Sequence, residues 1–126
     1  MPETLAKTTA EAFAPGRVVN LERSLVWGDL IDGHLMPGHV DSRGTVIGIV
    51  EEGETKRITI AMPENVRRYV ATKGSIAVNG VSLTVASESG DAFMVALIPY
   101  TLTHTNLGKI RVGDEVNIEA DMMARY

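Results

Sequence analysis

The sequence contains no cysteine, and this absence excludes several kinds of chemistry. The chain can form no disulfide, offers no thiolate nucleophile and cannot hold zinc through cysteine. Aromatic residues are scarce, with one Trp, three Tyr and two Phe, so the chain offers no platform on which the bases of a single strand could stack. With a net charge of −4 it also has no basic stripe to neutralise phosphates. We therefore expect no nucleic-acid partner.

Long apolar segments are absent as well. No run approaches the roughly 20 apolar residues that a membrane-spanning helix needs, and residues 1–4 lack the basic and apolar regions of a secretory signal. We expect a soluble, cytoplasmic protein without a membrane partner. The densest charged run, residues 51–57, mixes both signs around a glycine, and we interpret it as a solvated hairpin tip rather than a binding patch.

What the sequence does contain is a series of short β-branched or alternating runs separated by turn residues, a pattern that predicts β structure. Asn79 and Gly80 separate two of these runs and favour a two-residue type I′ turn, because both residues tolerate positive φ. One helix is expected over residues 62–72 and a short turn over residues 99–105. The pattern predicts an all-β fold with one short helix, a small antiparallel barrel filled by Val, Ile and Leu. The expected strands are residues 45–50, 57–61, 74–78, 81–85, 92–98 and 115–121.

An internal repeat is the most specific feature of the sequence. Residues 2–22 align without a gap on residues 99–119, and eight of these 21 positions are identical, where average residue usage predicts about one or two. The offset of 97 residues is itself the size of a domain, longer than the period of a solenoid repeat. We therefore expect a duplicated barrel, with residues 1–24 as the closing segment of a truncated first copy, residues 25–33 as a linker and residues 34–126 as the second copy. The identical pairs are Pro2/Pro99, Thr4/Thr101, Leu5/Leu102, Thr8/Thr105, Gly16/Gly113, Val19/Val116, Asn20/Asn117 and Glu22/Glu119.

Several segments resemble the riboflavin synthase family, whose two barrels arose by duplication. They are residues 19–23, 33–41, 73–85, 97–102, 105–108 and 116–121. The resemblance covers essentially all of the chain and implies a six-stranded Greek-key β-barrel of the riboflavin synthase type. It also implies the family's reaction, in which two molecules of 6,7-dimethyl-8-ribityllumazine exchange a four-carbon unit and give riboflavin and 5-amino-6-ribitylaminouracil. The reaction uses no cofactor and no metal, and the productive site lies between barrels of neighbouring subunits in a homotrimer.

The resemblance also implies which residues form the site of the second barrel. Glu3 and Thr4 match the ligand shelf of the truncated first barrel. Ser82 and Thr84 are two apart in a strand and so share a face, which by itself suits a ligand and solvent equally well; the resemblance favours the ligand. The expected catalytic residues are His39, Ser82, Thr84 and Asp121. The expected substrate-binding residues are Gly38, His39, Val40, Lys73, Ser82, Leu83, Thr84, Ile98, Pro99, Tyr100, Thr101, Leu102 and Thr103.

His39 is the leading candidate for handling protons, because an imidazole exchanges a proton near neutral pH. Its spacing alone favours an ordinary surface histidine, and only the resemblance reverses that interpretation. His34 and His39 do not form a metal site, since an offset of five points them to opposite faces of a strand. Lys73 suits the ribityl chain and solvent almost equally. Pro37 departs from the small hydroxyl residue common in the family and could shift the loop that carries His39.

Two further departures are Asn79, where the family often has aspartate, and Tyr100, at a variable and usually polar position. Family members continue beyond Tyr126 into a helix that helps to build the trimer, so this chain alone is expected to be weakly active or inactive. The alternatives are a non-catalytic lumazine- or flavin-binding module of the same fold and a generic flavin-reductase barrel. The presence of His39, Ser82 and Thr84 favours the enzyme.

Overall fold

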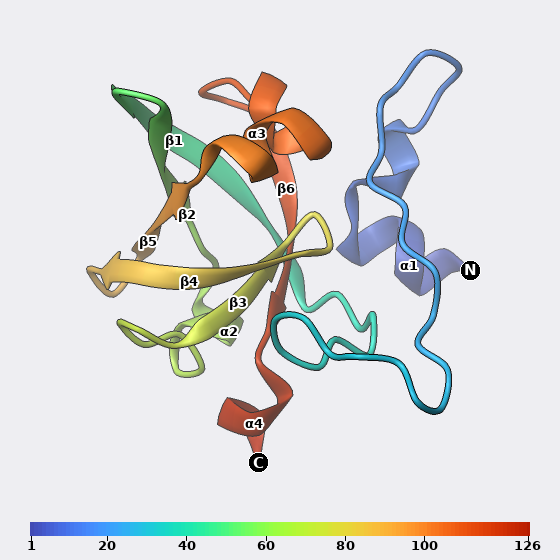
Figure 1. Ribbon diagram of the computed structural model, residues 1–126. Coiled ribbons are helices and arrows are strands. Elements are labelled where there is room, and N and C mark those ends of the chain that lie inside the picture. Colours follow the sequence, from blue (N-terminus) through green and yellow to red (C-terminus); the bar gives the residue numbers. More distant parts are fainter.

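Six antiparallel strands close into a barrel in the computed structural model, which describes residues 1–126 (Figure 1). Around the barrel the strands follow the order β1-β2-β5-β4-β3-β6, and β6 pairs with β1 to close it. The chain crosses from β2 to β3 and returns with β5 beside β2, which is a Greek-key connection. The expected six-stranded antiparallel barrel is confirmed. The strands are β1 (Ser42–Glu52), β2 (Thr55–Ala61), β3 (Ser75–Val78), β4 (Val81–Glu88), β5 (Ala92–Leu97) and β6 (Glu115–Ala120).

Local turn chemistry explains two of the hairpins. Asn79 and Gly80 join β3 to β4 with φ values of 49° and 76°, the positive values that a type I′ turn requires. At the other hairpin, residues 51–57 form the tip between β1 and β2, where Lys56 pairs with Glu51 and Arg57 with Glu52. Both features agree with the sequence-based predictions.

An apolar cluster of 15 buried residues lies at the centre of the fold. On β4, Val85 is buried and Val81 and Leu83 pack against the cluster, so Ser82 and Thr84 face outward from the barrel. This outer face is therefore the surface on which the predicted polar residues must act. The largest fully buried side chains are Phe93, Ile58, Ile60, Ile76, Leu97, Leu107, Ile118, Val46, Val66, Val78, Val85 and Val95.

The helices differ in length from the sequence-based prediction. Only α2 (Glu64–Arg67) forms within the helix expected over residues 62–72. After it the backbone bonds from Tyr69 to Val66 and from Gly74 to Ala71 span three residues, as in tight turns. Lys73, with φ of 71°, then leads the chain into β3. Conversely, α3 (Pro99–His104) is a helix where a short turn was expected.

Residues 1–41 lie beside the barrel rather than in it, with α1 (Pro2–Lys7) and the 3-10 helix η1 (Thr9–Ala12) at the start (Figure 1). This segment reproduces α3 and the 3-10 helix η2 (Asn106–Lys109) at the offset of 97. In each copy a threonine hydroxyl, that of Thr8 or Thr105, donates to the carbonyl oxygen four residues earlier at 2.7 Å. Each threonine then accepts a backbone N–H from two residues later.

The two copies of the repeat have the same backbone conformation as far as Gly16 and Gly113, whose φ values are 91° and 97°. Beyond these glycines the two copies differ. Residues 115–120 form β6, which pairs with β1 and β3. Residues 17–22 form no strand, because this segment has no neighbouring strands to complete its hydrogen bonds.

The chain ends in a short helix, α4 (Met122–Arg125). None of the helices is long and apolar enough to cross a membrane.

Candidate functional site

A row of three residues crosses the outer face of the barrel. Ala77 on β3 lies directly opposite Ser82 on β4 and Glu119 on β6. Residues opposed in this way place their side chains on the same face. Thr84 follows in the next outward-facing position of β4, opposite Ser75. Two of the predicted catalytic residues, Ser82 and Thr84, therefore share a polar outer surface.

The segment from residue 33 to residue 39 covers this row and is fastened at both ends. Near one end, the backbone N–H groups of Gly38 and His39 both donate to Glu119 Oε2 at 3.1 Å. Ala77 is only 1% exposed although it faces away from the core, because the segment lies over it. Glu119 is 8% exposed, and the two amide donors compensate the burial of its carboxylate.

Gly33 and His34 fasten the other end of the segment to Ser82. Gly33 has φ of 75°, and a Cβ atom there would lie 2.5 Å from Ser82 Oγ, so only glycine fits. The backbone N–H of His34 donates to Ser82 Oγ at 3.2 Å, and His34 Nδ1 lies 2.7 Å from the same oxygen. The remaining ring nitrogen, Nε2, is buried without a hydrogen-bond partner.

The His34–Ser82 contact was missed by the sequence reasoning, which considered His34 only as a metal ligand. The two residues are 48 positions apart, and no periodicity links them. The one local signal was the glycine immediately before His34. The structure brings no group of three or more His, Asp or Glu side chains together in a way that could hold a metal ion.

The side chains of His39 and Asp121, unlike that of Ser82, form no hydrogen bond with the covering segment or with the polar row. The His39 side chain is exposed, and the backbone of this residue makes the contact with Glu119. Asp121 follows β6, where its carboxylate accepts the N–H of Met123 and caps α4.

Asp41 joins the end of the N-terminal segment to β6, because its carboxylate accepts the N–H of Ala120 at 2.7 Å. Its other oxygen pairs with Arg125, and this hydrogen bond raises the pKa of the guanidinium.

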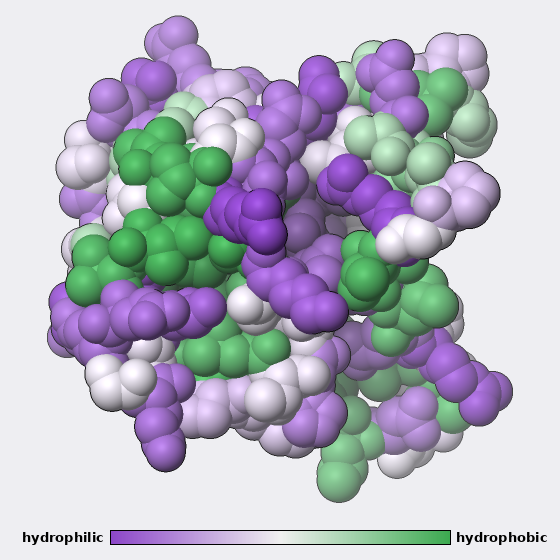
Figure 2. Space-filling model, turned by 90° about the horizontal axis from the view of Figure 1, so that it is seen from above, coloured by the Kyte–Doolittle hydropathy of each residue, from purple (hydrophilic) through white to green (hydrophobic).

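A cleft of about 750 Å³ separates the barrel from the N-terminal segment, and the space-filling view shows a hollow between these two parts (Figure 2). Ser82, Tyr100 and Thr103 of the predicted site line this cleft. The Tyr100 ring stacks on His104 with 3.9 Å between centroids, which places two flat rings on one wall. The full lining is Val18, Val19, Asn20, Leu21, Glu22, Asp32, Gly33, Met36, Gly80, Val81, Ser82, Tyr100, Thr103, His104, Thr105, Asn106 and Lys109.

The remaining predicted residues do not line this cleft. Lys73 and Thr84 are exposed, and the Leu102 side chain packs against the core, as does that of Leu83. Ile98 and Pro99 are exposed at the start of α3. The other predicted residues outside the cleft are Gly38, His39, Val40, Thr101 and Asp121.

Glu3 and Thr4 lie on α1, away from the polar row. Glu3 is paired with Lys7 at 2.8 Å on the exposed side of this helix. The hydrogen bond and the charge of Lys7 lower the pKa of Glu3, and the same pair raises the pKa of Lys7. The Thr4 carbonyl accepts the hydroxyl of Thr8.

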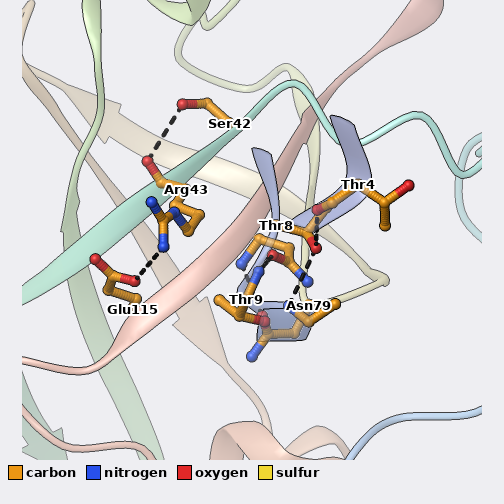
Figure 3. A network of polar contacts seen from close by, with 9 residues as sticks. Thr4, Thr8, Thr9, Ser42, Arg43, Asn79 and Glu115 are labelled. Atoms are coloured by element: carbon orange, nitrogen blue, oxygen red, sulfur yellow. Dashed lines mark hydrogen bonds and ion pairs between the residues drawn. The ribbon is translucent and has the colours of Figure 1, made fainter. Parts of the chain in front are cut away.

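Asparagine side chains join the N-terminal segment to the barrel through two matching bonds. The backbone N–H of Thr9 donates to Asn117 Oδ1 at 2.7 Å, and that of Asn106 donates to Asn20 Oδ1 at 2.7 Å. Both donors and both acceptors are related by the offset of 97, so each copy of the repeat gives the other the same bond. Asn79 Oδ1 supports this junction by accepting the N–H of Asn117. Figure 3 shows Thr8, Thr9 and Asn79 together at this junction.

The fold and the site define a small antiparallel barrel that presents hydroxyl and carboxylate groups on its outer face beside an open cleft. Residues 37–121 match the family model of the lumazine binding domain, and the chain belongs to this family.

Proteins named riboflavin synthase are similar to almost the whole chain. The one from Brucella abortus is 44% identical over 124 residues, which is 98% of this chain and 61% of that protein. The one from Chlamydia trachomatis is 46% identical over 98% of this chain and 60% of that protein. The one from Mycobacterium tuberculosis is 43% identical over 100% of this chain and 64% of that protein. The chain thus spans about three fifths of the length of these relatives, and the resemblance to riboflavin synthases is confirmed.

Solved structures give the same picture of the fold. LumP complexed with 6,7-dimethyl-8-(1'-D-ribityl) lumazine has a TM-score of 0.83 and 27% identity, and the match covers 95% of this chain and 64% of that one. LumP complexed with riboflavin has a TM-score of 0.84 and 28% identity, covering 94% of this chain and 64% of that one.

Proposed function

We propose that the chain is the second lumazine-binding barrel of a riboflavin synthase. Its reaction converts two molecules of 6,7-dimethyl-8-ribityllumazine into riboflavin and 5-amino-6-ribitylaminouracil by transfer of a four-carbon unit. The observation that carries this proposal is the 44% identity to a riboflavin synthase over 98% of the chain. We place the protein in the cytoplasm, as part of a homotrimer whose productive sites lie between barrels of neighbouring subunits.

The domain division is part of the same proposal. Residues 1–24 are the closing segment of a first barrel, residues 25–33 are a linker and residues 34–126 are the second barrel. The matching helices and the reciprocal bonds of Asn20 and Asn117 support it. Reciprocal bonds between equivalent residues are the pattern of an approximate two-fold axis between two like domains.

Positioning carries most of the mechanism. The reaction needs two flat rings held face to face, removal of a proton from a methyl group of one ring and addition of a nucleophile to the other. Holding two reactants in such a geometry can remove about 7–11 kcal/mol of barrier. Two similar half-sites, one from each kind of barrel, are suited to this task.

The residues of the second barrel divide this work. The hydroxyls of Ser82 and Thr84, with the strand backbone around Leu83, hold the pyrimidinedione edge. His39 handles the proton at the interface between barrels, and Asp121 orients the groups around it. Further contacts to the ring and the ribityl chain come from Gly38, Val40, Lys73, Ile98, Pro99, Tyr100, Thr101, Leu102 and Thr103.

A non-catalytic carrier of lumazine or flavin is the second candidate. The observation that favours it is the similarity to LumP, with TM-scores of 0.83 and 0.84 in complexes with a lumazine and with riboflavin. Both candidates use the same ligand surface. Formation of riboflavin when a first barrel is supplied distinguishes the enzyme from the carrier.

Fluorescence titration with 6,7-dimethyl-8-ribityllumazine tests the binding surface. We expect saturable binding by the chain, and binding about tenfold weaker for Ser82→Ala, because about 1.4 kcal/mol of hydrogen-bond energy is lost. Thr45→Ala is the matched control, since Thr45 is an exposed hydroxyl residue on β1, outside the proposed surface. Absence of saturable binding, or equal weakening by both variants, would contradict the proposal.

A further inference from the structure

The Ser82 hydroxyl has two nitrogen neighbours from a single residue. The backbone N–H of His34 donates to Ser82 Oγ at 3.2 Å, and His34 Nδ1 lies 2.7 Å from the same atom. Gly33 closes the adjacent side, since even a Cβ atom there would lie 2.5 Å from Oγ. Ser82 is half-buried and also lines the cleft, so this residue lies between the covering segment and open space.

The second of these contacts has two possible directions. A neutral imidazole carries its proton on one nitrogen and accepts with the other. If Nδ1 is bare, the Ser82 hydroxyl must donate its hydrogen to His34. If Nδ1 carries the proton, Ser82 Oγ accepts from both nitrogens and its own hydrogen points elsewhere.

The other ring nitrogen decides between these directions. His34 Nε2 is buried and has no hydrogen-bond partner. A proton on Nε2 would therefore be a buried donor without an acceptor, which is rare in folded proteins and costly. A bare Nε2 buries only an unused lone pair. The tautomer with the proton on Nδ1 is thus the one that leaves no orphaned donor.

From this geometry we infer that His34 is a positioning residue that fixes the Ser82 hydroxyl as a hydrogen-bond donor toward the cleft. Around Oγ, one direction is taken by Cβ and two by the N–H donors of His34, so the hydroxyl hydrogen occupies the remaining one. Such a donor selects a ligand atom that accepts. This inference rests on the proposed function, under which the accepting atom is a carbonyl oxygen of the lumazine ring.

The tautomer of His34 can be measured without a ligand. Nitrogen-15 NMR of the whole chain is expected to show the proton of His34 on Nδ1. In Ser82→Ala the ring loses its acceptor, and we expect the Nε2-protonated form that free histidine favours. A proton on Nε2 in the unmodified chain would overturn the inference, and so would a spectrum that does not respond to Ser82→Ala.

Three substitutions of His34 test the consequence for binding of 6,7-dimethyl-8-ribityllumazine. Asn places an amide donor near the position of Nδ1, so His34→Asn should bind within about twofold of the unmodified chain. His34→Gln carries the same amide one carbon further out, near Nε2, and His34→Leu carries none. Both should bind about tenfold more weakly, the loss that one constrained hydrogen bond produces.

Rescue by Asn but not by Gln separates a positioning role from a merely structural one, because both variants fill the space with an amide. Equal binding by the Gln and Asn variants, or undiminished binding by the Leu variant, would overturn the inference. If the unmodified chain binds no lumazine, the proposed function fails. The role of His34 then stands or falls on the tautomer alone.

Discussion

At the scale of single residues, the repeat shows that one residue type can have two different environments. Glu119 is buried and accepts two backbone N–H groups of the covering segment. Its counterpart in the repeat, Glu22, is exposed. The difference arises because Glu119 lies on a paired strand with a segment over it, whereas Glu22 lies in a segment that forms no strand.

Substitution of these two residues should therefore have unequal effects. Glu119→Ala leaves the N–H groups of Gly38 and His39 without their acceptor and should lower the free energy of unfolding by about 1–3 kcal/mol. Glu22→Ala serves as the control and should change it by less than about 0.5 kcal/mol. Urea unfolding followed by circular dichroism measures both. Equal losses in the two variants would contradict the role assigned to Glu119.

Gly33 and Gly28 form a second matched pair, since both have positive φ, at 75° and 95°. An added Cβ at Gly28 meets nothing within 4 Å, whereas one at Gly33 meets Ser82. Both alanine variants carry backbone strain of about 1–3 kcal/mol. Only Gly33→Ala should also displace His34 from Ser82, visible as a changed nitrogen-15 spectrum of His34. An unchanged His34 spectrum in that variant would show that the close packing at Gly33 is unimportant.

At the scale of elements, the sequence predicted what local chemistry determines. The hairpin at Asn79 and Gly80 followed from the need for two positive φ values, and the strands followed from alternation and β-branched residues. The extent of α2 did not follow, because the path from β2 to β3 is set by where β3 must pair. Residues 17–22 likewise share their pattern with β6 and yet form no strand, since strand formation needs neighbours.

The junction between the N-terminal segment and the barrel depends on Asn20. Its Oδ1 accepts the N–H of Asn106 at 2.7 Å, and its Nδ2 donates to the carbonyl of Asn79 at 2.8 Å. Asn20 Nδ2 also donates to Asn106 Oδ1 at 3.0 Å. Asn20→Ala removes all three bonds and should loosen the segment, which limited proteolysis within residues 23–31 would detect as faster cleavage. Asn20→Asp keeps the acceptor for Asn106 and should be cleaved at an intermediate rate. Cleavage of both variants at the unmodified rate would mean that the segment is held in some other way.

At the scale of the whole molecule, the candidate site could be predicted only in part. Residue types and a family resemblance named Ser82, Thr84 and His39. Their arrangement depends on contacts between residues 48 and 80 positions apart, and no spacing rule reaches that far. Gly33, His34 and Glu119, which hold the covering segment in place, were therefore absent from the prediction.

The central claim is that residues 34–126 form one of two lumazine-binding barrels. This barrel binds lumazine and needs the other barrel for turnover. The most direct test measures formation of riboflavin from 6,7-dimethyl-8-ribityllumazine by this chain, by the separately produced first barrel of a riboflavin synthase, and by both together. The account predicts no riboflavin above the buffer rate from the chain alone and clear formation from the mixture. Efficient turnover by the pure chain, or a mixture that binds lumazine and forms no riboflavin, would contradict it.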